Sequence, residues 1–319
     1  MDRRFEFYRE DLDPAVTLVV DGVAPGTLNL SHWPGNRTPA RYRADTTTEM
    51  ALLLASDPRR EQFLEGVRVV SNNHFDTDGL LSAWAVLHPG EALRHRRFLV
   101  DAARAGDFGT FTSADAVKFD LILTAFEDPR RSPLAPRLRG AGEEERSAVI
   151  YEDLLGRLPD LFYQVDAYRP LWEEPFERIV DSFQRVRDGG ARIREHHASR
   201  LSVIETDEEL EKMARFDACR YHRVLTAIRD GRGFRFELEH HIFSWFDTVT
   251  PPRGARLDLT PLATELNALE PRGEGRWTYT GNQDLSARLF LPDRDGDPAV
   301  SGLPLERVEQ IVSRTLLGS

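Results

Sequence analysis

The chain has little of several residue types, and each shortage excludes a class of chemistry. Cys219 is the only cysteine, which excludes an intrachain disulfide and a zinc site built from cysteines, and fits a reducing cytoplasm. Lysine occurs only at Lys118 and Lys212, so a phosphate-binding P-loop or a Schiff base has almost no candidate residue. Because the sequence has neither a run of about 18 apolar residues nor an apolar stretch behind its charged first residues, we expect no membrane span and no secretory signal.

Several catalytic signatures are also missing. The sequence contains no Gly-x-x-x-x-Gly-Lys-Ser/Thr, Gly-x-Ser-x-Gly, His-Glu-x-x-His or Gly-x-Gly-x-x-Gly, which argues against P-loop NTPases, α/β-hydrolases, zincins and simple dehydrogenases. The formal net charge of −11 argues against duplex nucleic acid as a partner, because such proteins usually carry a basic surface. A small phosphorylated substrate, held by a metal or a local cationic patch, is compatible with this charge.

The pattern of apolar residues changes along the chain. Strands are expected at 15–20, 27–31 and 67–71, helices at about 80–87 and 91–105 with an end near Gly106, and mainly helical structure from about 115 to 190. Later strands are expected at 201–205, 224–229, 234–243 and around 277–280, with a hairpin at 230–233 and a helix at about 260–269. We therefore predict an α/β protein, with a parallel-sheet domain at 1–190 and a smaller mixed α+β domain at 200–319.

The strand at 67–71 runs into a turn that carries three potential metal ligands. His74, Asp76 and Asp78 are two residues apart, and in an extended chain this spacing places them on one side. Two carboxylates and an imidazole gathered together are costly unless a cation or protons compensate them. Such a ligand set suits Mn²⁺ or Mg²⁺ better than Zn²⁺ or Fe²⁺. Gly79 allows a ligand to approach the backbone, and the helix that begins beside it offers N–H groups to a phosphate.

Other acids and a rigid loop are candidates for the same site. Asp107 follows the expected helix end, and Asp45 precedes the capping signature of Thr46 and Glu49, so either could assist the metal. An acidic turn and helix capping are the structural alternatives for these two residues. His32 and Arg37 belong to a polar, turn-rich loop after a strand and are candidate anion contacts, although the loop is equally compatible with a surface turn.

His240 and His241 are neighbours on an expected strand, so their rings face opposite sides. The alternation groups His240 with the apolar face and His241 with the charged face. Either could protonate a leaving group or bind phosphate, and the alternative for His240 is a buried structural role.

The turn resembles the first motif of the DHH phosphoesterase superfamily. The resemblance rests on a strand followed by His74-Phe75-Asp76-Thr77-Asp78-Gly79, and the short string around Asp107 is similar to a later Asp-bearing motif. It implies an N-terminal α/β domain with paired Mn²⁺, a smaller substrate domain, and metal ligation by His74, Asp76, Asp78 and then Asp107. The Asp-His-His string that names the superfamily is absent, and its nearest counterpart is Glu239-His240-His241.

These observations lead to one expectation and two alternatives. We expect a cytoplasmic, metal-dependent phosphoesterase that uses one or two Mn²⁺ or Mg²⁺ ions to hydrolyse a small phosphorylated molecule or short oligonucleotide. The first alternative is a catalytically inactive DHH-like protein that binds a metal or a small molecule, which the missing Asp-His-His favours. The second is an interaction module whose acidic residues are caps and solvated turns.

Overall fold

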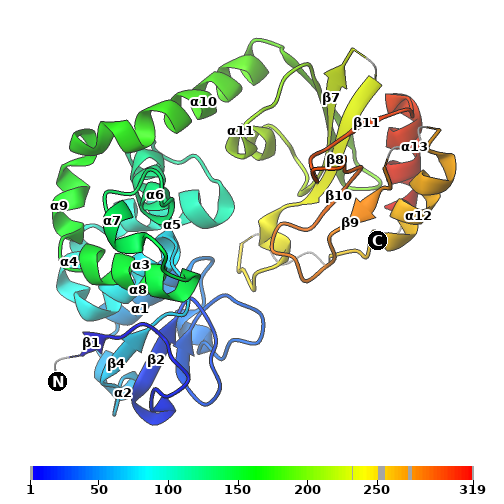
Figure 1. Ribbon diagram of the computed structural model, residues 1–319. Coiled ribbons are helices and arrows are strands. Elements are labelled where there is room, and N and C mark those ends of the chain that lie inside the picture. Colours follow the sequence, from blue (N-terminus) through cyan, green and yellow to red (C-terminus); the bar gives the residue numbers. More distant parts are fainter. Residues whose placement is uncertain (1–2, 232, 251–255, 272–274, 318–319) are drawn as a thin grey trace. The chain divides into compact units, whose positions relative to one another are not determined.

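The structure is a computed structural model that describes residues 3–231, 233–250, 256–271 and 275–317 (Figure 1). Its described residues divide into two compact units. The first unit runs as far as Glu177 and also includes the later segment 246–250, and the second unit begins at Arg178. The boundary therefore lies within helix α10 (Arg169–Arg187) rather than near residue 190. Within the described ranges, each helix is too short or too polar to cross a bilayer.

A four-stranded parallel sheet is the centre of the first unit. Its strands are β1 (Arg4–Phe5), β2 (Thr17–Val20), β3 (Leu28–Leu30) and β4 (Val69–Ser71), in the order β1-β4-β2-β3. All four residues of β2 are buried, which explains its continuous apolar sequence, because a central parallel strand is covered on both faces. Figure 1 shows these strands in blue, beside the helices that follow them.

Helices make up most of the rest of the first unit. They are α1 (Thr47–Ser56), α2 (Arg60–Phe63), α3 (Thr77–Leu87), α4 (Pro89–Arg94), α5 (Arg96–Phe108), α6 (Ala114–Glu127), α7 (Ala135–Leu138), α8 (Glu143–Leu154) and α9 (Leu158–Tyr163), with short 3-10 turns at Pro14–Val16, Ala40–Tyr42 and Val165–Tyr168. Helices α1, α3 and α5 pack on one another, and α5 packs on α6. Their apolar faces and the sheet form one core, in which Leu80, Trp84 and Phe119 are buried.

Two expected helix boundaries were wrong. Helix α3 begins at Thr77 instead of residue 80, because the Asp76 side chain caps it by accepting the N–H of Gly79. The helix expected at 91–105 is two helices, and the second continues through Gly106 to Phe108. Gly109 ends it in the left-handed conformation, with φ of 60°.

Gly106 serves close packing rather than helix termination. A Cβ atom at this position would lie 2.7 Å from Asp120 Oδ1 and 3.0 Å from Thr77 Cβ. Helices α3, α5 and α6 can therefore approach closely at Gly106 only because it lacks a side chain. Because α5 continues to Phe108, Asp107 lies in its last turn and not in a loop after it.

The second unit contains a mixed sheet, and this confirms the predicted fold class. Its main strands are β5 (Ala191–His196), β6 (Leu201–Thr206), β7 (Arg223–Asp230), β8 (Gly233–His240), β9 (Thr278–Tyr279) and β10 (Arg288–Phe290), in the order β5-β6-β7-β8-β10-β9, and β11 (Val300–Ser301) also pairs with β8. Only the β6–β7 pair is parallel among these described strands. The unit also contains α11 (Lys212–Asp217), α12 (Thr260–Leu269), α13 (Leu305–Thr315) and a 3-10 turn at Ile242–Ser244.

The predicted hairpin between β7 and β8 is confirmed. Asp230 pairs with Gly233 in an antiparallel register; Arg232, in the connection between them, is outside the described residues. The predicted end of β8 was wrong, because the strand stops at His240 and a 3-10 turn begins at Ile242.

Candidate metal centre

Three adjacent strands place the residues of the candidate site. Asp21 directly follows β2, His32 comes two residues after β3, and His74 three residues after β4. Because β2 lies between β4 and β3 and all three run parallel, their carboxyl ends meet at one edge of the sheet. Asp21 has φ of 49°, in the left-handed region that Asp tolerates better than most residues. The sheet order thus gathers residues that are far apart in the sequence.

The Asp21 carboxylate is the centre of the arrangement. Its Oδ1 lies 3.2 Å from His32 Nε2, and its Oδ2 lies 3.4 Å from His74 Nε2. Two groups of possible ligands result, and Asp21 belongs to both: one adds His74 and Asp76, the other adds His32 and Asp78. Within each group the candidate ligand atoms all lie within 4.8 Å of one another. We call these residues, together with Asp107, the Asp21 cluster.

His32 is oriented by a hydrogen bond on the far side of its ring. Its Nδ1 lies 2.5 Å from the carbonyl oxygen of Asp45, which can only accept, so Nδ1 carries the proton and donates. The lone pair of Nε2 then faces the carboxylates, with Asp107 Oδ2 at 3.4 Å and Asp78 Oδ2 at 3.9 Å. Metal-ligating histidines are typically held in this way. The buried Nε2 has no hydrogen-bond partner among the described residues.

His74 is arranged similarly on the other side of Asp21. Its Nδ1 lies 3.0 Å from Asn73 Oδ1, and its Nε2 lies 3.2 Å from Asp76 Oδ2. The other Asp76 oxygen accepts the N–H of Gly79 at 2.7 Å, so Oδ2 remains directed at the cluster. The side chains of His74 and Asp76 are 25% and 41% exposed, whereas those of Asp21 and His32 are each 1% exposed. Access from solvent is therefore on the His74 and Asp76 side.

Asp78 is held by a helix other than its own. Its Oδ2 accepts the N–H of Thr47 at 2.6 Å, and its Oδ1 accepts the N–H of Thr48 at 2.7 Å. Both donors belong to the first turn of α1, where free N–H groups favour a carboxylate. Thr46 caps this helix by accepting the N–H of Glu49, as the sequence signature predicted. Asp78 lies in the first turn of α3. It belongs to the ligand group of His32 and not to that of His74.

Burial and mutual repulsion perturb the acids of the cluster. Burial and then the charge of Asp21 raise the pKa of Asp78 to about 7, and burial with the neighbouring acids raises the pKa of Asp107 well above its ordinary value. Burial also works against ionisation of Asp21, but the two neighbouring imidazoles of His32 and His74 together outweigh it and lower its pKa. Protons or a cation must therefore balance this concentration of negative charge.

The two additional acids differ in what they can do. Asp107 Oδ2 is buried, faces His32 and has no hydrogen-bond partner among the described residues, so it is within reach of a cation near His32. Asp45 is outside both ligand groups, because its carboxylate accepts the N–H groups of Val249 and Thr250, each at 2.7 Å, and the hydroxyl of Thr250 at 2.6 Å. Asp45 therefore anchors the segment 246–250.

That segment covers the His32 side of the cluster. The Phe246 ring stacks on the His32 ring at 4.0 Å between centroids, and the Asp247 N–H donates to the His32 carbonyl at 2.7 Å. Sequence analysis gave no indication of this contact, because Phe246 and His32 are separated by more than two hundred residues.

The remaining predicted residues are not among these ligands. Gly79 donates its N–H to Asp76, so the start of α3 is already capped. Arg37 is exposed, and its N–H donates to Asn29. His240 and His241 are buried parts of the second unit, and burial lowers the pKa of His240 to about 4.

Asp21 is the main residue that sequence reasoning missed. The sequence at Asp21-Gly22 indicates only a turn after the strand at 15–20. The available signal was an acid directly at the carboxyl end of a buried strand, the same rule that identified His74 and Asp76. Applying it to each strand in turn would have found Asp21.

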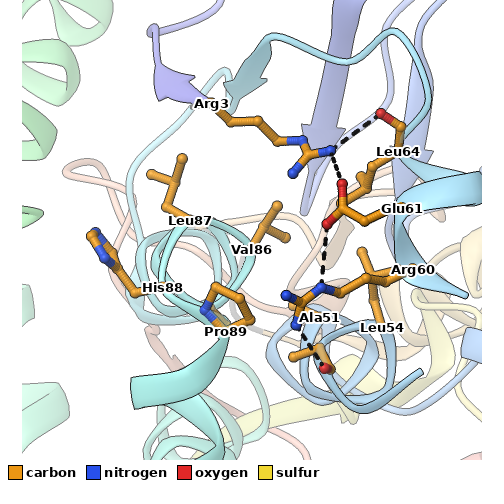
Figure 2. A pocket seen from close by; sticks show the side chains of 12 residues that line it. Arg3, Ala51, Leu54, Arg60, Glu61, Leu64, Val86, Leu87, His88 and Pro89 are labelled. Carbon is orange, nitrogen blue, oxygen red and sulfur yellow. Dashed lines mark hydrogen bonds and ion pairs between the residues drawn. The ribbon is translucent and has the colours of Figure 1, made fainter. Parts of the chain in front are cut away.

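A separate pocket of about 410 Å³ lies at the other end of α1 and α3 (Figure 2). Arg3 and Arg60 lie on its wall and both bond to Glu61, at 2.8 Å and 3.3 Å. Figure 2 shows this ion-pair network beside the apolar side chains of Val86 and Leu87. The charges of Arg3, Arg60 and Glu61 are thus paired with one another. The pocket is lined by the last turns of α1 and α3, whereas Asp78 lies in the first turn of α3.

Fold and site together define an α/β protein with a buried Asp/His cluster that could hold a metal ion. The chain belongs to DUF6687, a family of unknown function, whose model matches residues 1–316. Neither a curated protein nor a solved structure gave a significant match to the chain.

Proposed function

We propose that the protein is a metal-dependent phosphoesterase that hydrolyses a small phosphorylated molecule or short oligonucleotide. The observation that carries the proposal is that the two oxygens of Asp21 face two different groups of candidate ligands. Oxygen-rich sites with one imidazole for each ion suit Mn²⁺ or Mg²⁺. A carboxylate that faces two such positions is compatible with the closely spaced ion pair that two-metal hydrolases use. The resemblance to the DHH superfamily supports the same reading.

The two groups of candidate ligands differ in their access to solvent, and this gives them different roles. Bound divalent ions would supply Lewis acidity, which acidifies water and offsets charge on a phosphoryl group. Asp21, His74 and Asp76 form the more accessible group, so a substrate would enter there. On the other side, Phe246 covers His32 and limits the access of bulk water. Keeping water out of that side strengthens the interaction of the carboxylates with a cation.

The test is Mn²⁺-dependent hydrolysis of a generic phosphodiester and of pyrophosphate by wild-type protein and Asp21→Asn. Asparagine also tolerates the left-handed backbone, but it cannot bind two ions through charged oxygens. We expect the substitution to lower turnover by at least about a hundredfold, because even loss of a residue that only supports a metal ligand costs about 10–100-fold. Asp101→Asn, at a partly buried acid of α5 that pairs with Arg97 and is outside both ligand groups, is the matched control and should retain activity. Equal turnover in Asp21→Asn would contradict the proposal.

A second candidate is a metal-binding protein without hydrolytic activity. It is favoured by one observation: Asp76 already accepts the N–H of Gly79 at the start of α3, so this N–H is not available to a phosphate. Calorimetric binding of Mn²⁺ without turnover of either substrate would support this candidate.

A further inference from the structure

Two buried polar side chains near the cluster have donors without a partner among the described residues. Asn72 accepts the N–H of His74 through Oδ1, at 2.9 Å, but its Nδ2 has no hydrogen-bond partner. The Tyr151 hydroxyl also has none, although its ring stacks on Phe5 at 4.3 Å between centroids. Both residues are 0% exposed. A buried donor left unpaired is costly, so its retention calls for an explanation.

The two donors converge at Gly79. A Cβ atom built there would lie 2.4 Å from Asn72 Nδ2, 2.8 Å from Tyr151 Oη and 3.1 Å from Asp76 Oδ1. We call these three atoms the Gly79 niche. The niche is directly behind a candidate metal ligand, because Asp76 Oδ1 belongs to it while Asp76 Oδ2 faces His74 at 3.2 Å.

We propose that Tyr151 and Asn72 are positioning residues for Asp76, and that their donors bind a buried water that in turn donates to Asp76 Oδ1. The inference rests on the proposed function, since it requires Asp76 to be a metal ligand. The chemistry fits, because a water can accept from the hydroxyl and the amide and still donate to the carboxylate. This contact would fix the orientation of Asp76 and keep Oδ2 directed at the metal, as hydrogen bonds behind metal ligands commonly do.

The test is the Mn²⁺ affinity of Tyr151→Phe, measured by calorimetry, together with its melting temperature without metal. A purely structural role for Tyr151 predicts unchanged affinity. The positioning role predicts a Kd about tenfold weaker, at a metal-free melting temperature close to that of the wild type. Tyr42→Phe is the matched control: Tyr42 is also buried, but its hydroxyl donates to Asp57 at 2.8 Å, away from the cluster. This control should lose stability and keep its Mn²⁺ affinity.

The possible failures are distinguishable. Wild-type protein that binds no Mn²⁺ overturns the metal centre and this inference with it. Wild-type binding with the same Kd in Tyr151→Phe overturns this inference alone. A high-resolution crystal structure gives an independent check: we expect a water within about 3.2 Å of both Tyr151 Oη and Asn72 Nδ2, and a niche closed by direct contact of the two would contradict it.

Discussion

Each imidazole of the Asp21 cluster is held on one side so that its other nitrogen is fixed. The backbone carbonyl of Asp45 accepts a hydrogen bond from His32 Nδ1, and Asn73 Oδ1 lies at hydrogen-bond distance from His74 Nδ1. The Nε2 atoms then meet opposite oxygens of Asp21. The four acids and two imidazoles gathered in this way cost stability without a cation, as the raised pKa of Asp78 indicates. The cluster could therefore hold a metal ion, and it is costly to the fold while no cation balances it.

Asp120, a buried acid next to this cluster, should make the stability of the fold depend on pH. Burial raises its pKa to about 7, and its Oδ1 accepts the hydroxyl of Thr77 at 2.6 Å. Because the folded-state pKa is above the unfolded value, the folded protein binds more protons, and Asp120 destabilises the fold increasingly as pH rises from about 4 to about 7. Asp120→Asn keeps the acceptor and removes the charge. We expect its free energy of unfolding to exceed that of the wild type by an amount that grows with pH, on the order of 4 kcal/mol by about pH 8.

Urea unfolding of both metal-free proteins at several pH values measures this difference. A constant difference across the range would show that Asp120 does not titrate where we expect. Asp115→Asn, an exposed acid in the first turn of the same helix, is the control and should show no comparable pH trend.

At the scale of elements, Gly106 sets how closely three helices approach. Ala in place of Gly within a helix normally stabilises by about 1 kcal/mol. At Gly106 we expect the opposite, a loss of about 1–3 kcal/mol, because the new Cβ would be 2.7 Å from Asp120 Oδ1. Gly90 in α4 has nothing within 4 Å of such a Cβ, so Gly90→Ala is the control and should be neutral or stabilising. Thermal unfolding compares the two, and a stable Gly106→Ala would contradict the packing argument.

The segment 246–250 is a second element with a testable role. Asp45 holds it through Val249 and Thr250, and Phe246 covers His32. We expect Asp45→Ala to cost about 1–3 kcal/mol of stability, because two backbone N–H groups lose their acceptor. Hydrogen exchange should become faster in 246–250 and remain slow in β2. Unchanged exchange in 246–250 would show that other contacts are sufficient to hold the segment.

For the whole molecule, the sequence predicted what depends on local pattern. The apolar runs of β2 and β4 indicated a parallel sheet, and the alternation with Asp230 and Gly233 indicated the β7–β8 hairpin. The spacing of His74, Asp76 and Asp78 indicated a metal site, but not that Asp78 would face a different group from the other two.

What could not be predicted depends on contacts between distant segments. The order β4-β2-β3 brings Asp21 between His74 and His32, and no local pattern specifies that order. The local sequence predicts a helix end at Gly106, because the tight contact of Gly106 with Asp120 involves another helix and leaves no local pattern. The hydrogen bonds from residues 249 and 250 to the Asp45 carboxylate could not be predicted from the sequence either. Such tertiary contacts override local preference.

We propose that the Asp21 carboxylate binds two divalent ions at once. Anomalous diffraction from crystals soaked in Mn²⁺ tests it most directly. We expect two peaks, one at Asp21, His74 and Asp76 and the other at Asp21, His32 and Asp78. Absence of any peak at Asp21, or side chains that point away from one another there, would contradict it.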